Sequence, residues 1–383
     1  MSGIAVIGAG LGGLTLALAL TRQGRRVTVY EQADELGEVG AGITLSPNSS
    51  RVLQHLGLGD AIARMGFSPG KQWTQNWRTG DVILEFERGP ELSARYGAPY
   101  VHIHRADLHG LLVDALREAQ PDAIALGHRL IEVEADGNLR FANGHAAQAD
   151  VAVGADGLHS VVRRSLFGDV RPAFTGQVAW RGIVPAERLP DGTRGMTPGI
   201  HVGPGRLFMR YPVRHGALLN YAAFGELEGW EEESWSIPST IEELLGHFEG
   251  WHETVRRIIA ATPENQIYKW ALHTREPLPT WIAGRVTLLG DAAHAMLPFM
   301  GQGAATAVED GMVLARCLAS FEAEEALRRY EAARLDRTTM VQTQSRLLGM
   351  KFQGKDPDAL GRGPVQNEES LGLFAYDAVN VPI

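Results

Sequence analysis

The chain has 383 residues, enough for two or three domains, and its 44% hydrophobic and 21% charged residues are close to the averages of globular proteins. A formal net charge of -9, with no long run of Lys or Arg, argues against nucleic acid or an anionic membrane surface as a partner. The single cysteine, Cys317, excludes an intrachain disulfide, and no early segment approaches the roughly 20 apolar residues of a membrane span, so we expect a cytoplasmic protein.

Residues 4–30 predict a strand, a glycine-rich turn, a helix and a second strand. Gly8, Gly10 and Gly13 leave room for backbone N–H groups at the helix start to approach a pyrophosphate. Glu31 follows the second strand, where an acid can hydrogen-bond a ribose 2′-OH. This βαβ unit is therefore predicted to bind a dinucleotide, either NAD or FAD. The predicted cofactor contacts in this unit also include Leu11, Gly12 and Gln32.

Strand-like and helical segments alternate along the rest of the chain. We predict strands at 72–88 and 99–105, a helix at 107–119, a β-meander at 123–154, a strand-rich stretch at 172–274, a strand at 285–289 and a helix at 304–320. The simplest organisation has a discontinuous nucleotide-binding domain (1–71, 98–171 and 275–350), a substrate domain (72–97 and 172–274) and a C-terminal tail (351–383). The tail is expected to wrap the surface or to order against a partner subunit.

Two later motifs, each after an apolar strand, decide between the two cofactors. They read Gly-Ala-Asp-Gly-Leu-His-Ser at 154–160 and Leu-Gly-Asp-Ala-Ala-His at 289–294. Together with the first glycine turn, their order resembles the para-hydroxybenzoate hydroxylase family of FAD-dependent aromatic monooxygenases, up to about residue 350. The chain is most similar to the branch of salicylate hydroxylase, 3-hydroxybenzoate 6-hydroxylase and 6-hydroxynicotinate 3-monooxygenase. The resemblance implies an α/β fold, with a Rossmann-like FAD-binding domain and an inserted mixed β-sheet substrate domain.

The resemblance also implies which residues hold FAD. Asp156 matches the motif associated with the FAD pyrophosphate and the pyridine nucleotide, and Asp291 matches the acid that hydrogen-bonds the ribityl chain. Gly301, Gln302 and Gly303 open the following helix and would place backbone N–H groups at the flavin N1–C2=O edge, where a reduced flavin is anionic. Further predicted contacts are Gly42, in the loop 38–43 beside the flavin, Arg105 and Leu130.

The implied reaction is hydroxylation of a small aromatic or N-heteroaromatic carboxylate. NADH or NADPH would reduce FAD, dioxygen would add to form a flavin C4a-hydroperoxide, and one oxygen atom would pass to the ring. Pro298 matches a proline beside the bound ring and Tyr100 resembles a substrate-pocket tyrosine, so both are predicted catalytic residues. The residues predicted to bind substrate are Tyr211 and two arginines whose planar guanidinium groups suit a carboxylate, Arg206 and Arg210.

Two positions depart from the pattern of the family. Salicylate-type relatives carry a histidine where this chain has Leu207, and the 6-hydroxynicotinate branch has one where Thr44 stands. The catalytic base is therefore unassigned. His102 and His104 share a strand face with Tyr100, which leaves open a pocket role or a structural one.

Other functions stay open at this point. An FAD-dependent NAD(P)H reductase, or another flavin oxidoreductase without oxygen insertion, is the main alternative. A flavin halogenase would need a Trp-x-Trp-x-Ile-Pro signature, which the sequence lacks, and the complete motif set argues against a flavin sensor. We expect no metal site, because no His or Cys cluster has ligand spacing. The expected partners are a small aromatic substrate and O2, in a monomer or homodimer.

Overall fold

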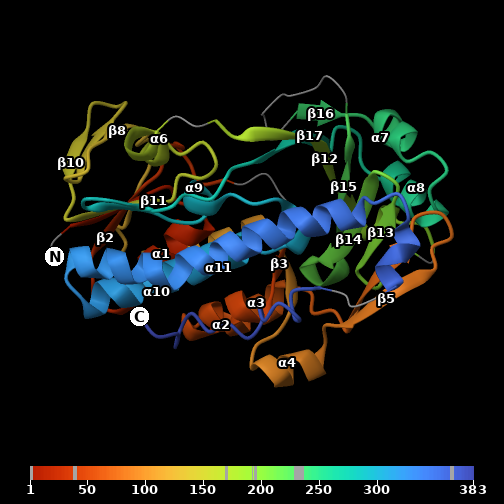
Figure 1. The fold of residues 1–383 in the computed structure, drawn as a ribbon, viewed down its shortest axis with the longest axis horizontal. Coiled ribbons are helices and arrows are strands. Elements are labelled where there is room, and N and C mark those ends of the chain that lie inside the picture. Colours follow the sequence, from red (N-terminus) through yellow and green to blue (C-terminus); the bar gives the residue numbers. More distant parts are fainter. Residues whose placement is uncertain are drawn as a thin grey trace.

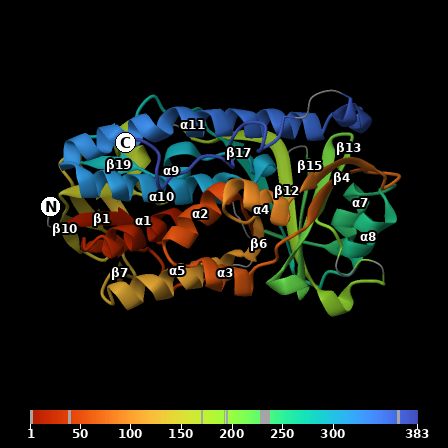
Figure 2. The same ribbon diagram turned by 90° about the horizontal axis from the view of Figure 1, so that it is seen from below.

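The computed structural model describes residues 3–37, 41–168, 171–191, 193, 196–227, 237–362 and 366–383. Two large sheets lie toward opposite ends of an elongated molecule, and the long helix α11 (Ala323–Phe352) runs beside both of them (Figures 1 and 2). Of the predicted flavin loop, residues 38–40 lie outside the described residues.

The first large sheet has six strands in the order β18-β19-β11-β1-β2-β7. All neighbouring strands are parallel except the edge pair β18 and β19. The strands are β1 (Ile4–Ile7), β2 (Val27–Tyr30), β7 (Ile124–Ala125), β11 (Val151–Gly154), β18 (Ile282–Ala283) and β19 (Val286–Leu288). Helix α1 (Leu11–Arg22) connects β1 to β2, and it is buried from Leu11 to Leu20 because it packs on α5 (Arg105–Ala119) and α10 (Gly303–Ser320). The predicted Rossmann-like unit is confirmed.

The second large sheet is mixed and has eight strands in the order β16-β17-β12-β15-β14-β13-β4-β5. Among the described strands of this sheet, β13 and β4 alone pair in parallel. The strands are β4 (Lys71–Asn76), β5 (Val82–Glu87), β12 (Ala173–Pro185), β13 (Gly199–Gly203), β14 (Arg206–Val213), β15 (Leu218–Glu226), β16 (Ile237–Ser239) and β17 (Ile267–Thr274). Helices α7 (Ile241–His247) and α8 (Glu253–Ala260) lie at the same end of the molecule (Figure 1), and Phe248 between them joins the core of Trp180, Phe208 and Tyr221. The inserted mixed sheet of the predicted fold class is thus present.

The β-meander predicted over 123–154 is only partly correct. Strands β8 (Leu130–Val133), β9 (Asn138–Phe141) and β10 (Ala146–Gln148) form a small antiparallel sheet, as that pattern predicts. Strands β7 and β11 leave it and join the parallel sheet. The difference has a physical reason, because β11 is apolar and buried along its whole length, which suits an inner parallel strand covered on both faces.

Short elements connect the two large sheets. Strands β3 (Gly42–Leu45) and β6 (Val101–His104) form an antiparallel ribbon, in which Thr44 stands opposite His102. The remaining helices are α2 (Pro47–His55), α3 (Gly59–Met65), α4 (Pro90–Tyr96), α6 (Val161–Phe167) and α9 (Asp291–His294). Since β6 contacts β14, this ribbon brings the end of the parallel sheet against the mixed sheet.

The C-terminal segment 366–383 returns along the molecule after α11. Leu373 and Phe374 are buried, and Arg51 of α2 donates hydrogen bonds to the carbonyl oxygens of Tyr376 (2.7 Å) and Tyr96 (2.5 Å). The segment therefore packs on its own chain, beside α2 and α4. Among the described residues, no helix is both long and apolar enough to cross a membrane.

Candidate active site

The glycine turn after β1 needs its glycines for two different reasons. Gly8 has a φ of +107°, and a Cβ there would lie 2.5 Å from the carbonyl oxygen of Ala155. A Cβ on Gly13 would lie 2.3 Å from the carbonyl oxygen of Gly8, so the helix could not approach the strand. Gly10 has no heavy atom within 4 Å of a built Cβ, and no side chain caps α1. The start of α1 is thus open to a pyrophosphate.

Glu31 is fixed at the end of β2. Its carboxylate accepts hydrogen bonds from the backbone N–H groups of Ala9 (2.8 Å) and Ala33 (3.0 Å). His109 on α5 supports the same turn by donating from Nε2 to the carbonyl oxygen of Ala9 at 2.8 Å. The acid is thus tied to the glycine turn, and its predicted contact with a ribose stays a prediction. Gln32 beside it is exposed, whereas Leu130 is a buried core residue on β8.

Asp156 is placed at the start of α6. It accepts hydrogen bonds from the Ser160 hydroxyl (2.5 Å) and from the backbone N–H groups of Val161 (2.7 Å) and Val162 (3.2 Å). Burial raises its pKa, against the opposing effect of these hydrogen bonds. Within the protein, Asp156 is therefore a capping residue of α6, and its predicted cofactor contact stays a prediction.

Asp291 begins α9 after Gly290, whose φ is +61°. The loss of hydration among surrounding groups raises the pKa of its carboxyl, while the charges of His294 and Arg105 oppose that shift. The residue is nevertheless exposed, so its carboxylate can accept a hydrogen bond from a bound molecule. Arg105, the first residue of α5, lies near enough to influence it electrostatically.

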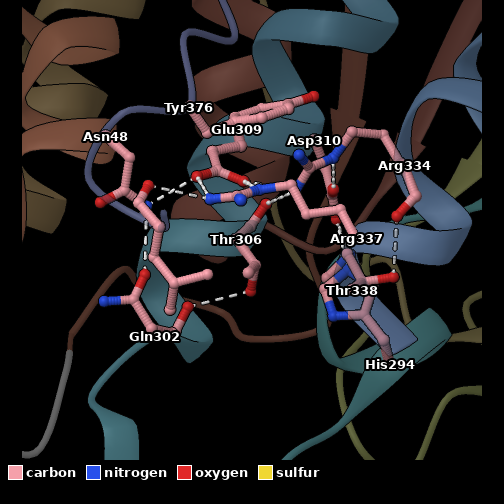
Figure 3. A network of polar contacts seen from close by, with 12 residues as sticks. Asn48, His294, Gln302, Thr306, Glu309, Asp310, Arg334, Arg337, Thr338 and Tyr376 are labelled. Carbon is pink, nitrogen blue, oxygen red and sulfur yellow. Dashed lines mark hydrogen bonds and ion pairs between the residues drawn. The ribbon is translucent and has the colours of Figure 1, made fainter. Parts of the chain in front are cut away.

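Gln302 directly precedes α10 and belongs to a buried polar network (Figure 3). Its side-chain oxygen accepts from Asn48 Nδ2 (3.1 Å), which also donates to Glu309 Oε1 (2.6 Å). Arg337 donates to both oxygens of Glu309 at 2.8 Å. The side chain of Gln302 therefore holds the turn in place and does not cap α10, so no side chain of the described residues covers the first backbone N–H groups of this helix, which begins at Gly303.

The same network continues to His294, the last residue of α9 (Figure 3). Asp310, which is fully buried, accepts from His294 Nε2 (2.5 Å), Arg334 Nε (2.7 Å) and the backbone N–H of Gly290 (3.1 Å). Burial opposes ionisation, yet His294 and Arg334 lower the pKa of Asp310 to about 2. The network thus ties the Asp291 turn and the Gly301–Gly303 turn to α11. Sequence reasoning missed it, although Glu309-Asp310 inside an apolar helix was a visible signal.

A cavity of about 510 Å³ lies between these turns and the mixed sheet. One wall is the turn of Pro298, Phe299 and Met300 with Gly301, directly before α10. The carbonyl oxygen of Pro298 accepts from the backbone N–H of Gly301 at 2.9 Å. Tyr100, Tyr211, Thr44 and His102 line the cavity as well. The structure therefore brings both predicted catalytic residues and Tyr211 to one space.

The ribbon of β3 and β6 supplies a polar corner of this cavity. Thr44 Oγ1 and His102 Nδ1 share a hydrogen bond of 3.1 Å, and the His102 ring stacks on Tyr211 with centroids 4.3 Å apart. Burial, with the charge of Arg88 in addition, lowers the pKa of His102 to about 3. Burial also raises the pKa of Tyr100 to about 12. At neutral pH this corner therefore holds an uncharged imidazole and a protonated phenol. Gly42 packs under Tyr211, and its backbone N–H donates to Asn220 Oδ1 at 2.7 Å.

Of the two arginines predicted for a carboxylate, Arg210 is among the described residues that line the cavity and Arg206 is not. The charge of Arg206 is felt by His247 on α7. Arg210 is buried and donates to Gln75 Oε1 (2.9 Å) and His201 Nδ1 (3.1 Å). Arg206 is the first residue of β14 and Phe208 packs toward α7, whereas Arg210 and Tyr211, further along the strand, line the cavity. Arg88, which sequence reasoning missed, is a second buried arginine in the cavity wall.

Comparison with known proteins identifies the family of this chain. A family model described as FAD binding domain matches residues 1–345. A 3-amino-4-hydroxybenzoate 2-monooxygenase of Streptomyces platensis is 41% identical over 92% of this chain and 89% of its own length. The 6-hydroxynicotinate 3-monooxygenase of Pseudomonas fluorescens is 39% identical over 99% of this chain and 96% of its own.

A solved structure supports the same assignment. The chain superimposes with a TM-score of 0.84 and 29% identity on a Klebsiella pneumoniae protein complexed with FAD and uric acid, covering 97% of this chain and 95% of that one. Among the described residues, no group of three or more His, Cys, Asp or Glu side chains could hold a metal ion. The resemblance read from the three fingerprints is confirmed. The chain therefore belongs to the FAD-binding-domain family, and it is a flavoprotein monooxygenase whose cofactor is FAD.

Proposed function

We propose that this monooxygenase hydroxylates a small aromatic or N-heteroaromatic carboxylate of the salicylate type. The cavity that ends on Pro298 and Gly301 carries the proposal, because it meets the open start of α10 at the predicted flavin edge. Pockets for small molecules typically measure about 300–1,000 Å³, so about 510 Å³ suits a single-ring acid. The relatives support this class, since 3-amino-4-hydroxybenzoate and 6-hydroxynicotinate are both hydroxylated ring acids.

The electron donor in this proposal is NADH or NADPH and the oxygen source is dioxygen. Bound FAD would take up the electrons and supply the oxygen-transfer chemistry, which no side chain can provide. Glu31 would hold the ribose, Asp291 the ribityl chain, and the first N–H groups of α10 the edge of the flavin that becomes anionic on reduction.

The residues of this chain bind and orient the ring in this proposal. Tyr100, with its raised pKa, stays protonated and can donate a hydrogen bond to a substrate oxygen. Tyr211 and Phe299 provide apolar surfaces that exclude water from the reacting atoms. Thr44 joins Tyr100 and His102 in one hydrogen-bonded chain, which can accept or donate a hydrogen bond at a ring hydroxyl.

The test is oxidation of NADH and of NADPH by the FAD-loaded protein in air, with salicylate, 3-hydroxybenzoate, 6-hydroxynicotinate and 3-amino-4-hydroxybenzoate added separately. We expect one acid to accelerate the oxidation and to yield a product that is heavier by one oxygen atom. If an acid is consumed equally well without oxygen, a flavin reductase that inserts no oxygen takes the place of this proposal.

A further inference from the structure

We infer that Arg88 is the ligand of the substrate carboxylate, an inference that rests on the proposed function. Arg88 directly follows β5, and its backbone N–H donates to the carbonyl oxygen of Gly70 at 2.9 Å. Its side chain is 2% exposed and lines the cavity. A guanidinium group is planar and always charged, so a position fixed in the wall gives it a defined direction toward a bound acid.

The hydrogen bonds of Arg88 leave one part of the guanidinium group free. Nε donates to Gln72 Oε1 at 2.9 Å, and one terminal nitrogen donates to Glu368 Oε2 at 3.2 Å. The other terminal nitrogen, NH1, is buried and has no hydrogen-bond partner. A buried charged donor without an acceptor is costly, and a carboxylate oxygen is the acceptor that best matches it.

Three aromatic rings hold this guanidinium group in place. Its central carbon lies 4.7 Å from the ring centroid of Tyr100 and 5.3 Å from those of Phe86 and Phe374. Tyr100 and Phe86 line the cavity too, so the fixed cation and the surfaces that would contact a ring belong to one wall. The arrangement can bind an aromatic ring and its acid group together.

Other cations of the cavity are less suited to this role. Lys351, Lys355 and Arg362 also line it, but all three are exposed, so water solvates their charges. Arg210 lines it too and is buried, but both of its terminal nitrogens already donate hydrogen bonds, to Gln75 Oε1 (2.9 Å) and to His201 Nδ1 (3.1 Å). Glu368, from the C-terminal segment, balances the charge of Arg88. It also competes with a bound acid for the same cation. Removing its charge should therefore strengthen acid binding, whereas removing Arg88 should weaken it.

The experiment compares three variants of the FAD-loaded protein by titration of the flavin absorbance. The probes are salicylate, 3-hydroxybenzoate and 6-hydroxynicotinate, each beside its neutral carboxamide. Arg88→Gln should weaken acid binding by about tenfold to a hundredfold, with the amide changed by less than about threefold. Glu368→Gln should bind the acid more tightly than the unmodified chain. Arg95→Gln is the matched control, because it removes an exposed ion pair with Glu369 of the same segment and should leave both affinities unchanged.

Each other outcome overturns a stated claim. If Arg88→Gln weakens the binding of the acid and of its amide equally, Arg88 only anchors the C-terminal segment. The same conclusion follows if Arg95→Gln weakens acid binding as much as Arg88→Gln does. If Arg88→Gln does not fold or retain FAD, Glu368→Gln decides, and unchanged or weaker acid binding rejects the role of Arg88. If the unmodified chain hydroxylates an acid and Arg88→Gln binds that acid normally, only the inference fails. If the unmodified chain binds none of the acids, the proposed function fails with it.

Discussion

Replacing Asp310 with Asn tests whether the buried network stabilises the fold and holds the cofactor turns. Asp310 and Arg334 are both fully buried, and the carboxylate also accepts from His294 and Gly290. Breaking a buried ion pair by changing one partner costs about 3–5 kcal/mol. An independent figure comes from the pKa of Asp310, because its lowering from 3.8 to about 2 corresponds to about 2 kcal/mol. We therefore expect Asp310→Asn to lower the free energy of unfolding by about 3 kcal/mol at pH 7.

The pH dependence of that loss has a defined sign. Since the folded-state pKa of Asp310 is depressed, its contribution to the free energy of unfolding is complete above pH 4 and disappears as the pH falls toward 2. The difference in free energy of unfolding between the unmodified chain and Asp310→Asn should therefore become smaller below pH 4. Because Gly290 precedes Asp291, the variant should also retain less FAD.

The assay is urea unfolding followed by tryptophan fluorescence at pH 7 and pH 3, with the flavin content of the purified protein measured in parallel. Glu324→Gln is the control, because its pair with Arg328 has side chains that are 81% and 56% exposed, and such pairs contribute about 0.5 kcal/mol. A loss below about 1 kcal/mol for Asp310→Asn, or one equal to that of the control, would refute the reasoning.

Three further predictions concern single positions. Gly8→Ala should lower the flavin content of the purified protein, because its Cβ would lie 2.5 Å from a carbonyl oxygen. Gly97→Ala is the control, since Gly97 has a φ of +68° but no atom within 4 Å of a built Cβ, and it should keep its flavin. Equal flavin content in the two variants would contradict this prediction. Asp291→Asn should release FAD on dilution while unfolding at the same urea concentration, and undiminished flavin would count against its ribityl role. His102→Gln should lose less stability in acid than the unmodified chain. Because the folded-state pKa of His102 is about 3, the unmodified chain should lose about 2 kcal/mol of unfolding free energy between pH 7 and pH 5, and an equal loss in the variant, measured by urea unfolding, would reject this.

The cofactor half of the site could be predicted because its determinants are local in sequence. Gly8, Gly13 and Glu31 lie within one βαβ unit, so spacing alone placed them around the start of α1. The steric reason for each glycine was not visible, since Gly8 is constrained by Ala155, which lies far along the chain.

The substrate half depended on contacts that no local pattern contains. Arg88 meets Glu368 across 280 positions, and Thr44 meets His102 only because β3 pairs with β6. The prediction for Arg206 considered side-chain chemistry without its place on the strand. Arg206 begins β14 and is not among the described residues that line the cavity, whereas Arg210, further along the same strand, is. Asp310 and Arg334 satisfy each other in the core, which only the packing of α10 on α11 brings about.

The central claim is that the chain inserts one atom of dioxygen into a ring acid bound at this cavity. The most direct test is a reaction of the FAD-loaded protein with NADH or NADPH under isotopically labelled dioxygen, with the four acids as substrates and the products analysed by mass spectrometry. The account predicts one labelled oxygen atom in the product of at least one acid. Oxidation that returns all the label as hydrogen peroxide or water, with no labelled ring product from any acid, would contradict it.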